Sequence, residues 1–258
     1  MVRSLRSWMV LALCAHACGG SLAVDVGTSA QRETAPTEAA AEPADWPQRQ
    51  KIAAGLAVAR GSGEGDDAAL VAAELAKFPL LALRALERQH THVVICRGSV
   101  TDYLTELRGV QPTGWPDGMT WDNVPGTFSS FNNEVVIAVV SSEGGGYHVP
   151  VTGEGHAAYN LVLHETTHSL DWNGGERRRS INDKQFLAAR DADFSSLSAY
   201  EQQDGRWGIQ ETYAESAARY FGGNPNDATQ HPNLHAYWDG PGQTALQVWR
   251  STTDAKPL

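Results

Sequence analysis

Two histidines four residues apart, with a glutamate directly after the first, are the residues of this sequence best suited to chemistry. They lie in LVLHETTHSLDW, residues 161–172, as His164, Glu165 and His168. Residues four apart on a helix have Cβ atoms about 5 to 6 Å from each other, so both imidazoles can bind one ion at about 2.0 to 2.1 Å. Glu165 points in a neighbouring direction and can contact a water on the ion. The pattern predicts one Zn2+ per chain, with Glu165 as the general base.

A catalytic zinc site needs three protein ligands and an open position for water, so one more ligand is required. The longer pattern HExxHxxGxxH would place glycine at 171 and histidine at 174, where this chain has Asp171 and Gly174. That class of site is therefore excluded. The segment QETYAESAARYF, residues 210–221, offers Glu211 and Glu215 on one helical face. Glu211 is the predicted ligand, and Glu215 is predicted to accept the free ring N–H of a zinc-bound histidine.

Several residues near these segments keep alternatives open. Glu176, in the charged turn GGERRRS, and Glu201 compete for the third ligand position. An ordinary amphipathic helix with two solvated glutamates is the alternative for residues 210–221. Asp171 is interpreted as a group that supports a ligand or caps the helix, not as a ligand. Three other histidines are interpreted as structural: His156, His231 and His235.

The elements that must position these residues are a mixture of helices and strands. Apolar spacing predicts a helix of about four turns over residues 155–175, ending at a glycine C-cap. Ala-rich and Leu-rich segments predict helices at 66–78, capped by Asp66 or Asp67, and at 80–89. The β-branched runs HVVICRGSV and NEVVIAVVSS predict strands, and a loop rich in Trp, Pro and Gly joins them. HPNLHAYW predicts a loop and a final helix.

HETTHSLD, followed some forty residues later by ETYAESAARY, resembles the catalytic domain of anthrax lethal factor and the secreted Pro-Pro endopeptidases, a family of zinc metallopeptidases. That family joins HExxH to a helix of the form E-[FY]-[FY]-A-E-[AS]-x-x-R. The resemblance implies an α+β, zincin-like domain with a small mixed sheet, an active-site helix carrying HExxH and a mostly helical C-terminal part. It also implies that His164, His168 and Glu211 bind zinc, that Glu165 is the base and that Glu215 is the supporting acid.

The resemblance further implies an active-site tyrosine shortly before the ligand glutamate, whose hydroxyl assists the developing oxyanion. Tyr200 in SLSAYEQQ is the candidate, eleven residues before Glu211. The intervening EQQDGRWG is interpreted as a small insertion. Tyr213 and Tyr159 are interpreted as structural.

Composition limits the classes of partner. The 258 residues carry a formal net charge of -10, which disfavours nucleic acid and anionic membrane surfaces. No segment approaches the ~20 apolar residues that a membrane span needs. Of the three cysteines only Cys96 falls in the expected domain, so no disulfide framework is predicted. Cys96 is interpreted as a buried strand residue, with an inhibitory zinc thiolate as the alternative.

The N-terminal segment predicts export. Residues 1–23 combine two arginines, a short apolar run and small residues, a pattern typical of an export signal. Cys18, in AHACGG, resembles a lipobox cysteine and is a candidate lipid anchor; cleavage at an A-x-A-like site is the alternative. Residues 24–45 are predicted to be a disordered tether and residues 46–258 the zinc metallopeptidase domain. The protein is expected to be secreted or held at the cell envelope, with the bacterial lipoprotein favoured.

These observations predict a zinc metalloendopeptidase, a monomeric hydrolase acting on protein or peptide substrates and not on nucleic acid. The alternative is a non-catalytic zinc-containing surface binding lipoprotein of the same fold, which would have no need of Glu165. Substrate contacts are expected from the strand edge beside the zinc helix and from loops around Trp115 and Trp121. The substrate itself is not predicted.

Overall fold

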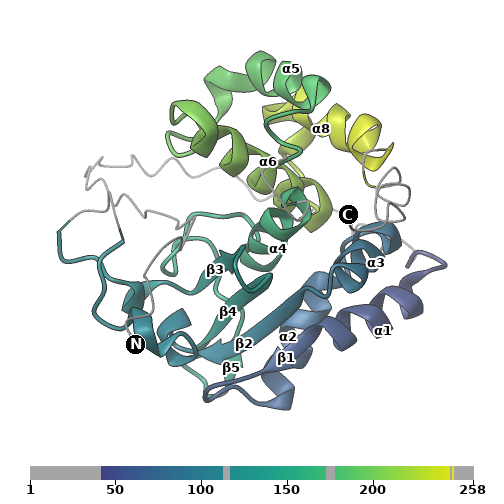
Figure 1. The fold of residues 1–258 in the computed structure, drawn as a ribbon. Coiled ribbons are helices and arrows are strands. Elements are labelled where there is room, and N and C mark those ends of the chain that lie inside the picture. The colour runs from purple at the N-terminus through teal and green to yellow at the C-terminus, as the bar shows by residue number, and fades with distance from the viewer. Residues whose placement is uncertain (1–41, 113–116, 173–177, 245, 247–258) are drawn as a thin grey trace, which may run out of the picture.

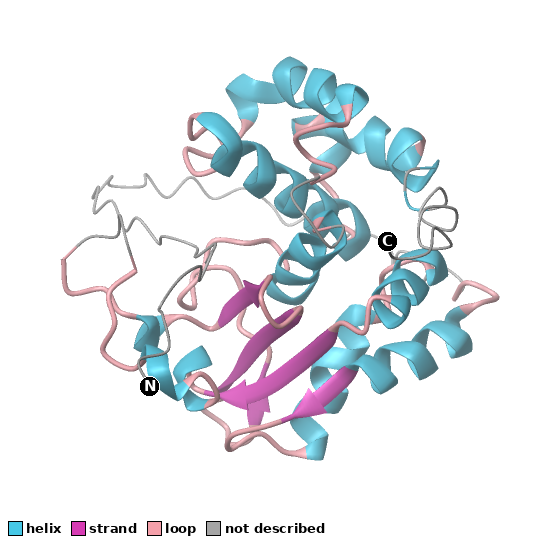
Figure 2. Cartoon of the chain, in the orientation of Figure 1, coloured by secondary structure: helices cyan, strands magenta, loops and turns pink. Residues whose placement is uncertain are grey.

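A sheet of five strands runs through the part of the chain that the computed structural model describes, residues 42–112, 117–172, 178–244 and 246 (Figures 1 and 2). The strands are β1 (Ala57–Ala59), β2 (His92–Arg97), β3 (Gly126–Ser129), β4 (Glu134–Ser141) and β5 (Tyr147–His148). The main order is β1-β2-β4-β3, in which β1, β2 and β4 are parallel and β3 is antiparallel to β4. β5 pairs antiparallel with the end of β4. The sheet is therefore small and mixed, as expected.

Helices and short turns surround this sheet. The α-helices are α1 (Trp46–Leu56), α2 (Gly65–Leu75), α3 (Leu80–Arg88), α4 (Leu161–Asp171), α5 (Lys184–Asp193), α6 (Gly205–Gly222), α7 (Asp227–Gln230) and α8 (Pro232–Asp239). The 3-10 helices are η1 (Val100–Asp102), η2 (Thr105–Leu107), η3 (Trp121–Asn123) and η4 (Phe194–Ser196). In the described residues, no helix is both long enough and apolar enough to cross a membrane.

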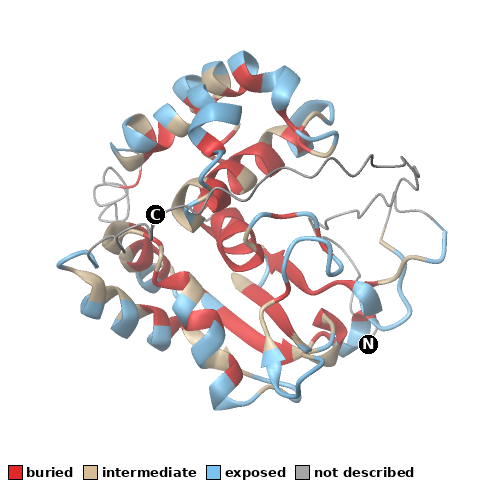
Figure 3. Ribbon diagram, turned by 180° about the vertical axis from the view of Figure 1, so that it is seen from behind, coloured by how far each residue is buried: buried red, intermediate tan, exposed pale blue. Residues whose placement is uncertain are grey.

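Both faces of the sheet are covered, which explains why β2 and β4 read as continuous apolar runs. Alternate residues such as Ile95 and Ile137 join the main core with helices α1 to α4. Their neighbours Val94 and Val136 face a smaller core closed by η1, η3 and nearby loops. Figure 3 shows these buried residues continuing from the central strands into the helix beside them.

α4 lies at the centre of the molecule, between the sheet and the C-terminal helices (Figure 1). It contacts β3 and β4 on one side and α6 on the other. A third core of aromatic and aliphatic residues holds α5, α6 and α8 together, including Phe186, Tyr213 and Trp238. The mostly helical C-terminal part thus has its own interior and presents α6 to α4.

The zinc helix is shorter than predicted. α4 begins at Leu161, not at residue 155, because Asn160 adopts an extended conformation and its side chain accepts a hydrogen bond from the Leu163 N–H. Gly155, with φ +78°, belongs to the preceding turn. The helix ends at Asp171, and the predicted glycine cap lies outside the described residues.

Two other boundaries differ from the prediction. The cap of α2 is Glu64, which exchanges hydrogen bonds with Asp67 in a capping box, rather than Asp66 or Asp67 itself. α6 begins at Gly205 rather than at residue 210, so the last four residues of EQQDGRWG form its first turn. The predicted export signal, Cys18 and residues 24–41 of the tether lie outside the described residues.

Candidate metal centre

α4 brings His164, Glu165 and His168 into the interior of the protein. All eleven of its residues are buried, including these three polar side chains. β3 lies close to the helix because residue 126 is glycine. A Cβ added there would stand 2.7 Å from Leu161 Cδ1 and 3.1 Å from Glu165 Cγ. The absence of that atom allows the strand to approach the side of α4 that carries Glu165.

The structure brings His164, His168 and Glu211 together, although Glu211 comes from α6. One ligand atom from each lies within 4.8 Å of the others, and all three side chains are buried. The two Nε2 atoms are 3.2 Å apart. Glu211 Oε2 lies 3.2 Å from His164 Nε2, and Glu211 Oε1 lies 3.7 Å from His168 Nε2. Ligand atoms about 2.0 to 2.1 Å from a tetrahedral zinc would be about 3.3 Å apart, so these residues fit the ion.

Glu211 is a buried acid beside the two histidines. Within the described part of the chain, neither of its carboxylate oxygens has a hydrogen-bond partner. Burial alone would raise the pKa of Glu211, but His168 and His164 hold it at about 2. Burial opposes protonation of His164, yet Glu211 and Glu215 raise its pKa well above the usual range. The cluster is therefore built to surround positive charge.

Glu215, one turn after Glu211, orients His164. The distance from His164 Nδ1 to Glu215 Oε2 is 3.1 Å, and a carboxylate can only accept there. In the neutral ring Nδ1 therefore carries the proton, which leaves the lone pair on Nε2 for a metal ion. The other oxygen, Oε1, accepts the Tyr159 N–H at 2.9 Å. Glu215 thus ties the chain before α4 and the ring of His164 to α6.

Asp171 lies at the end of α4, and its carboxylate bonds to the chain that follows the helix. It accepts the Ser180 N–H and hydroxyl, each at 2.7 Å, and lies 3.8 Å from the Arg178 guanidinium. Burial raises the pKa of Asp171 against these contacts. His168 Nδ1 has no hydrogen-bond partner in the described part of the chain. Asp171 therefore anchors the chain that returns after α4.

Glu165 stands beside the cluster with both carboxylate oxygens buried, and neither has a hydrogen-bond partner among the described residues. Burial raises the pKa of Glu165 to about 8, against the pull of His164 and with the help of Glu211. A carboxylate with a raised pKa accepts a proton readily near neutral pH. Its position and environment suit proton transfer.

Tyr200 lies in the turn between η4 and α6, where it is half-buried and packs against the main core. It is not one of the three residues of the metal-binding group. The alternative ligand Glu201 is directed instead to Arg219, at 3.0 Å. Glu176 lies outside the described residues.

The remaining alternatives have structural surroundings. His156 bonds to the Pro150 carbonyl, and both His231 and His235 lie beside Asp227. Tyr213 is buried in the C-terminal aromatic core. Tyr159, in contrast, is partly exposed and gives its backbone N–H to Glu215.

Burial describes the surroundings of Trp121 and of Cys96. Trp121 is 2% exposed and packs in the smaller core, so its side chain anchors the loop around it, and substrate contacts from that loop stay a prediction. Trp115 lies outside the described residues. Cys96 is a buried residue of β2 in the same smaller core, away from the core that contains α4, and burial raises the pKa of its thiol to about 12. The zinc-thiolate alternative is therefore wrong.

Three contributors to the site were not predicted. Asn160 caps α4, Gly126 lets β3 approach α4, and Arg219 lies 3.7 Å from Glu215. Only Arg219 could have been found from the sequence, since it occupies the arginine position of the family helix pattern. The other two act through contacts between segments that are separate in sequence.

A mixed α+β domain with an HExxH helix against its sheet, and a carboxylate brought to that helix by a later one, defines a zincin-like class of protein. Residues 60–228, more than half of the chain, match the family described as anthrax toxin lethal factor, N- and C-terminal domain. The chain belongs to this family, and the predicted resemblance is confirmed.

Individual relatives agree with this membership. The chain is 36% identical over 114 residues to a Pro-Pro endopeptidase of Paenibacillus alvei and 33% identical over 114 residues to one of Clostridioides difficile. Each match covers 43% of this chain, and 48% and 47% of those relatives, so the chain spans about half the length of the curated relatives it matches.

A solved structure extends the similarity to the fold. The structure of the Pro-Pro endopeptidase PPEP-2 from Paenibacillus alvei matches with a TM-score of 0.59 and 26% identity. The match covers 73% of this chain and 98% of that one. The predicted fold class is confirmed.

Proposed function

We propose that this protein is a zinc-dependent endopeptidase. The observation that carries the proposal is the pairing of two features in one buried place. Three metal-binding side chains converge there. The carboxylate of Glu165, which has no hydrogen-bond partner in the described residues, lies on α4 with the two histidines. A purely structural metal site has no need for such a carboxylate. Relatives named Pro-Pro endopeptidases support the same reaction class.

His164, His168 and Glu211 would hold the ion, with Glu215 keeping the His164 ring in the tautomer that binds. When bound, zinc would polarise the scissile carbonyl and lower the pKa of water to about 7. Glu165 would take the proton of the attacking water and then donate it to the leaving amine. Tyr200 is the candidate donor to the oxyanion, a role implied by the family resemblance.

The free edge of β3 is the proposed position for an extended substrate. In the described residues, β3 pairs only with β4, so no strand bonds to its other edge, although its four residues are buried. Gly126 on this strand approaches Glu165. A peptide added along this edge by main-chain hydrogen bonds would bring its carbonyl groups toward Glu165 and the three ligands.

The test compares two glutamate variants in a diverse peptide library that includes Pro-Pro sequences. Glu165→Gln should keep zinc and lose about 10²- to 10⁴-fold in turnover, because general acid–base catalysis contributes about that much. Glu211→Gln should lose zinc as well as turnover. The exposed Glu106→Gln is the matched control and should resemble the parent. If Glu165→Gln cleaved as fast as the parent while holding zinc, the proposed role of Glu165 would be wrong.

The same assay separates the enzyme from its alternative. A parent protein that holds zinc and cleaves no peptide of the library would favour the surface binding protein. A chelator should abolish cleavage by the parent, and added zinc should restore it.

We also propose that the protein acts outside the cytoplasm. The proposal rests on the basic and apolar pattern of residues 1–23 and on Cys18 within AHACGG. Mass spectrometry of the mature N-terminus tests it. An acylated N-terminal Cys18 would support the lipid anchor, and an unmodified N-terminus after Ala17 or Ala23 would support free secretion.

A further inference from the structure

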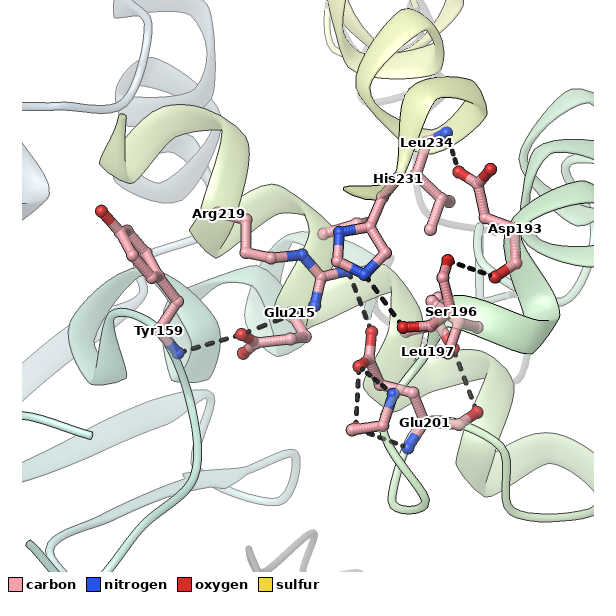
Figure 4. A network of polar contacts seen from close by, with 12 residues as sticks. Tyr159, Asp193, Ser196, Leu197, Glu201, Glu215, Arg219, His231 and Leu234 are labelled. Atoms are coloured by element: carbon pink, nitrogen blue, oxygen red, sulfur yellow. Dashed lines mark hydrogen bonds and ion pairs between the residues drawn. The ribbon is translucent and has the colours of Figure 1, made fainter. Parts of the chain in front are cut away.

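A chain of charged side chains runs from Glu215 through Arg219 to Glu201 (Figure 4). Glu215, which bonds to His164, is followed one helical turn later by Arg219. The Arg219 side chain is only 7% exposed, and its Nη1 lies 3.7 Å from Glu215 Oε1. The charged contacts of the metal cluster therefore continue past Glu215 to Arg219.

Arg219 contacts two further carboxylates. Its Nη2 donates to Glu201 Oε1 at 3.0 Å, and its Nε donates to Asp227 Oδ1 at 3.2 Å. Both acids are almost fully buried. A planar guanidinium with five N–H groups can serve several carboxylates at once, which a lysine cannot reproduce. Removing Arg219 would take away the guanidinium that these three carboxylates share.

Glu201 links this arginine to the turn that contains Tyr200. Glu201 directly follows Tyr200, and its Oε2 accepts the Ser198 N–H at 3.1 Å and the Ser198 hydroxyl at 2.8 Å. Its carbonyl accepts Arg190 Nη2 at 2.7 Å. The carboxylate of Glu201 thus closes the turn on which Tyr200 is carried, and Arg219 holds that carboxylate from α6.

We infer that Arg219 is a positioning residue that aligns two parts of the site. Through Glu215 it fixes the ring of His164, and through Glu201 it fixes the turn of Tyr200. The inference deepens the proposed function and rests on it for the role of Tyr200. Glu215 lies on α6 and Glu201 lies in the turn before it, and the guanidinium of Arg219 contacts both (Figure 4). Arg219 therefore sets the position of the turn relative to Glu215.

The first experiment measures zinc affinity of the full chain by competition with a chelator. Arg219→Gln should raise the zinc dissociation constant about 10- to 100-fold, as is typical when the partners of metal-bound histidines are removed. Arg219→Lys should give an intermediate increase, since it keeps the charge and loses the fork. Arg97→Gln is the matched control because Arg97 forms ion pairs with Asp67 and Glu64 far along the sheet. It should leave the zinc dissociation constant within about twofold of the parent.

The second experiment measures hydrogen–deuterium exchange of the turn at residues 198–203. Glu201→Gln and Arg219→Gln should each speed exchange there about tenfold, and Arg97→Gln should not. If Arg219→Gln does not fold, zinc affinity and hydrogen–deuterium exchange are both measured on Arg219→Lys. A lower melting temperature for the Arg219 variants with unchanged zinc affinity and unchanged exchange of the turn would mean a merely structural role and would overturn the inference.

These readouts separate the inference from the proposed function. If the parent binds zinc and cleaves no peptide, the proposed function fails while both measurements still test Arg219. If the parent cleaves peptides and the Arg219 variants match it in zinc affinity and exchange, the inference alone fails.

Discussion

α4 and α6 both supply metal-binding side chains, but they are built differently. α4 has 11 residues, all buried, and a side-chain cap from Asn160. α6 has 18 residues, of which ten are buried, and the side chain of its N-cap Asp204 makes no capping hydrogen bond. α6 ends at Gly222, and its C-cap Gly223 has a φ of 75°, which suits a left-handed cap.

The two helices also contribute side chains of different size to their contact. Four buried apolar residues of α4 belong to the main core, Leu161, Val162, Leu163 and Leu170, whereas α6 contributes buried Ala218 and, near its end, partly buried Phe221. Small residues on α6 let its backbone approach α4, so that Glu211 reaches the two histidines. α4 therefore forms the centre of the site, and the packing of α6 against α4 determines whether Glu211 reaches the two histidines.

Truncation of α4 should have the largest effect on stability. Leu163 is fully buried in the main core, so Leu163→Ala should lower the free energy of unfolding by about 2 to 5 kcal/mol. Urea denaturation measures this change. Leu70→Ala on α2, where the leucine is 39% exposed, is the control and should cost far less. A loss below about 1 kcal/mol for Leu163→Ala would contradict the central role of α4.

Removal of the contact between the helices should weaken metal binding. Glu215→Gln takes the charged acceptor from His164 Nδ1, so the zinc dissociation constant should rise about 10- to 100-fold. Chelator competition measures it. Glu87→Gln on α3, an exposed site, should leave the constant unchanged. Equal affinities for Glu215→Gln and the parent would show that α6 contributes to the site through Glu211 alone.

Enlargement of the small surface of α6 should separate the helices. Ala218 is fully buried, and Ala218→Leu should cost about 1 to 3 kcal/mol of unfolding free energy through overpacking. Chemical denaturation measures the loss. Ala69→Leu, an exposed site on α2, provides the same change in volume without the packing constraint. A stable Ala218→Leu variant would mean that the two helices tolerate a wider separation.

Removal of the N-cap side chains of α4 and α6 should give the smallest changes in stability. Asn160→Ala removes the side-chain acceptor of the Leu163 N–H, at 3.1 Å, and should cost about 1 kcal/mol. Asp204→Ala on α6 should change stability by less than about 0.5 kcal/mol, because that aspartate makes no capping bond. The two variants are compared by thermal denaturation, and equal losses would contradict the difference between the two N-termini.

Prediction from sequence succeeded where the signal is local. The strands at residues 92–97 and 134–141 were expected from their β-branched runs, and they are β2 and β4. The short strands β1 and β3 were not expected, because three or four residues carry too little pattern and owe their conformation to pairing. The early start of α6 was missed for a similar reason: Gly205 and Gly208 disfavour helix locally, and packing overrides them.

The sequence by itself determined the pairing of His164 with His168, because an interval of four residues puts two side chains on one side of any helix. It also determined family membership through the two helix patterns. Tertiary structure alone decided that Glu211, 43 positions after His168, meets both imidazoles, that Glu201 turns to Arg219, and that Trp121 is buried. Spacing along a chain controls neighbours within one element, whereas contacts between elements depend on the packing of the whole core.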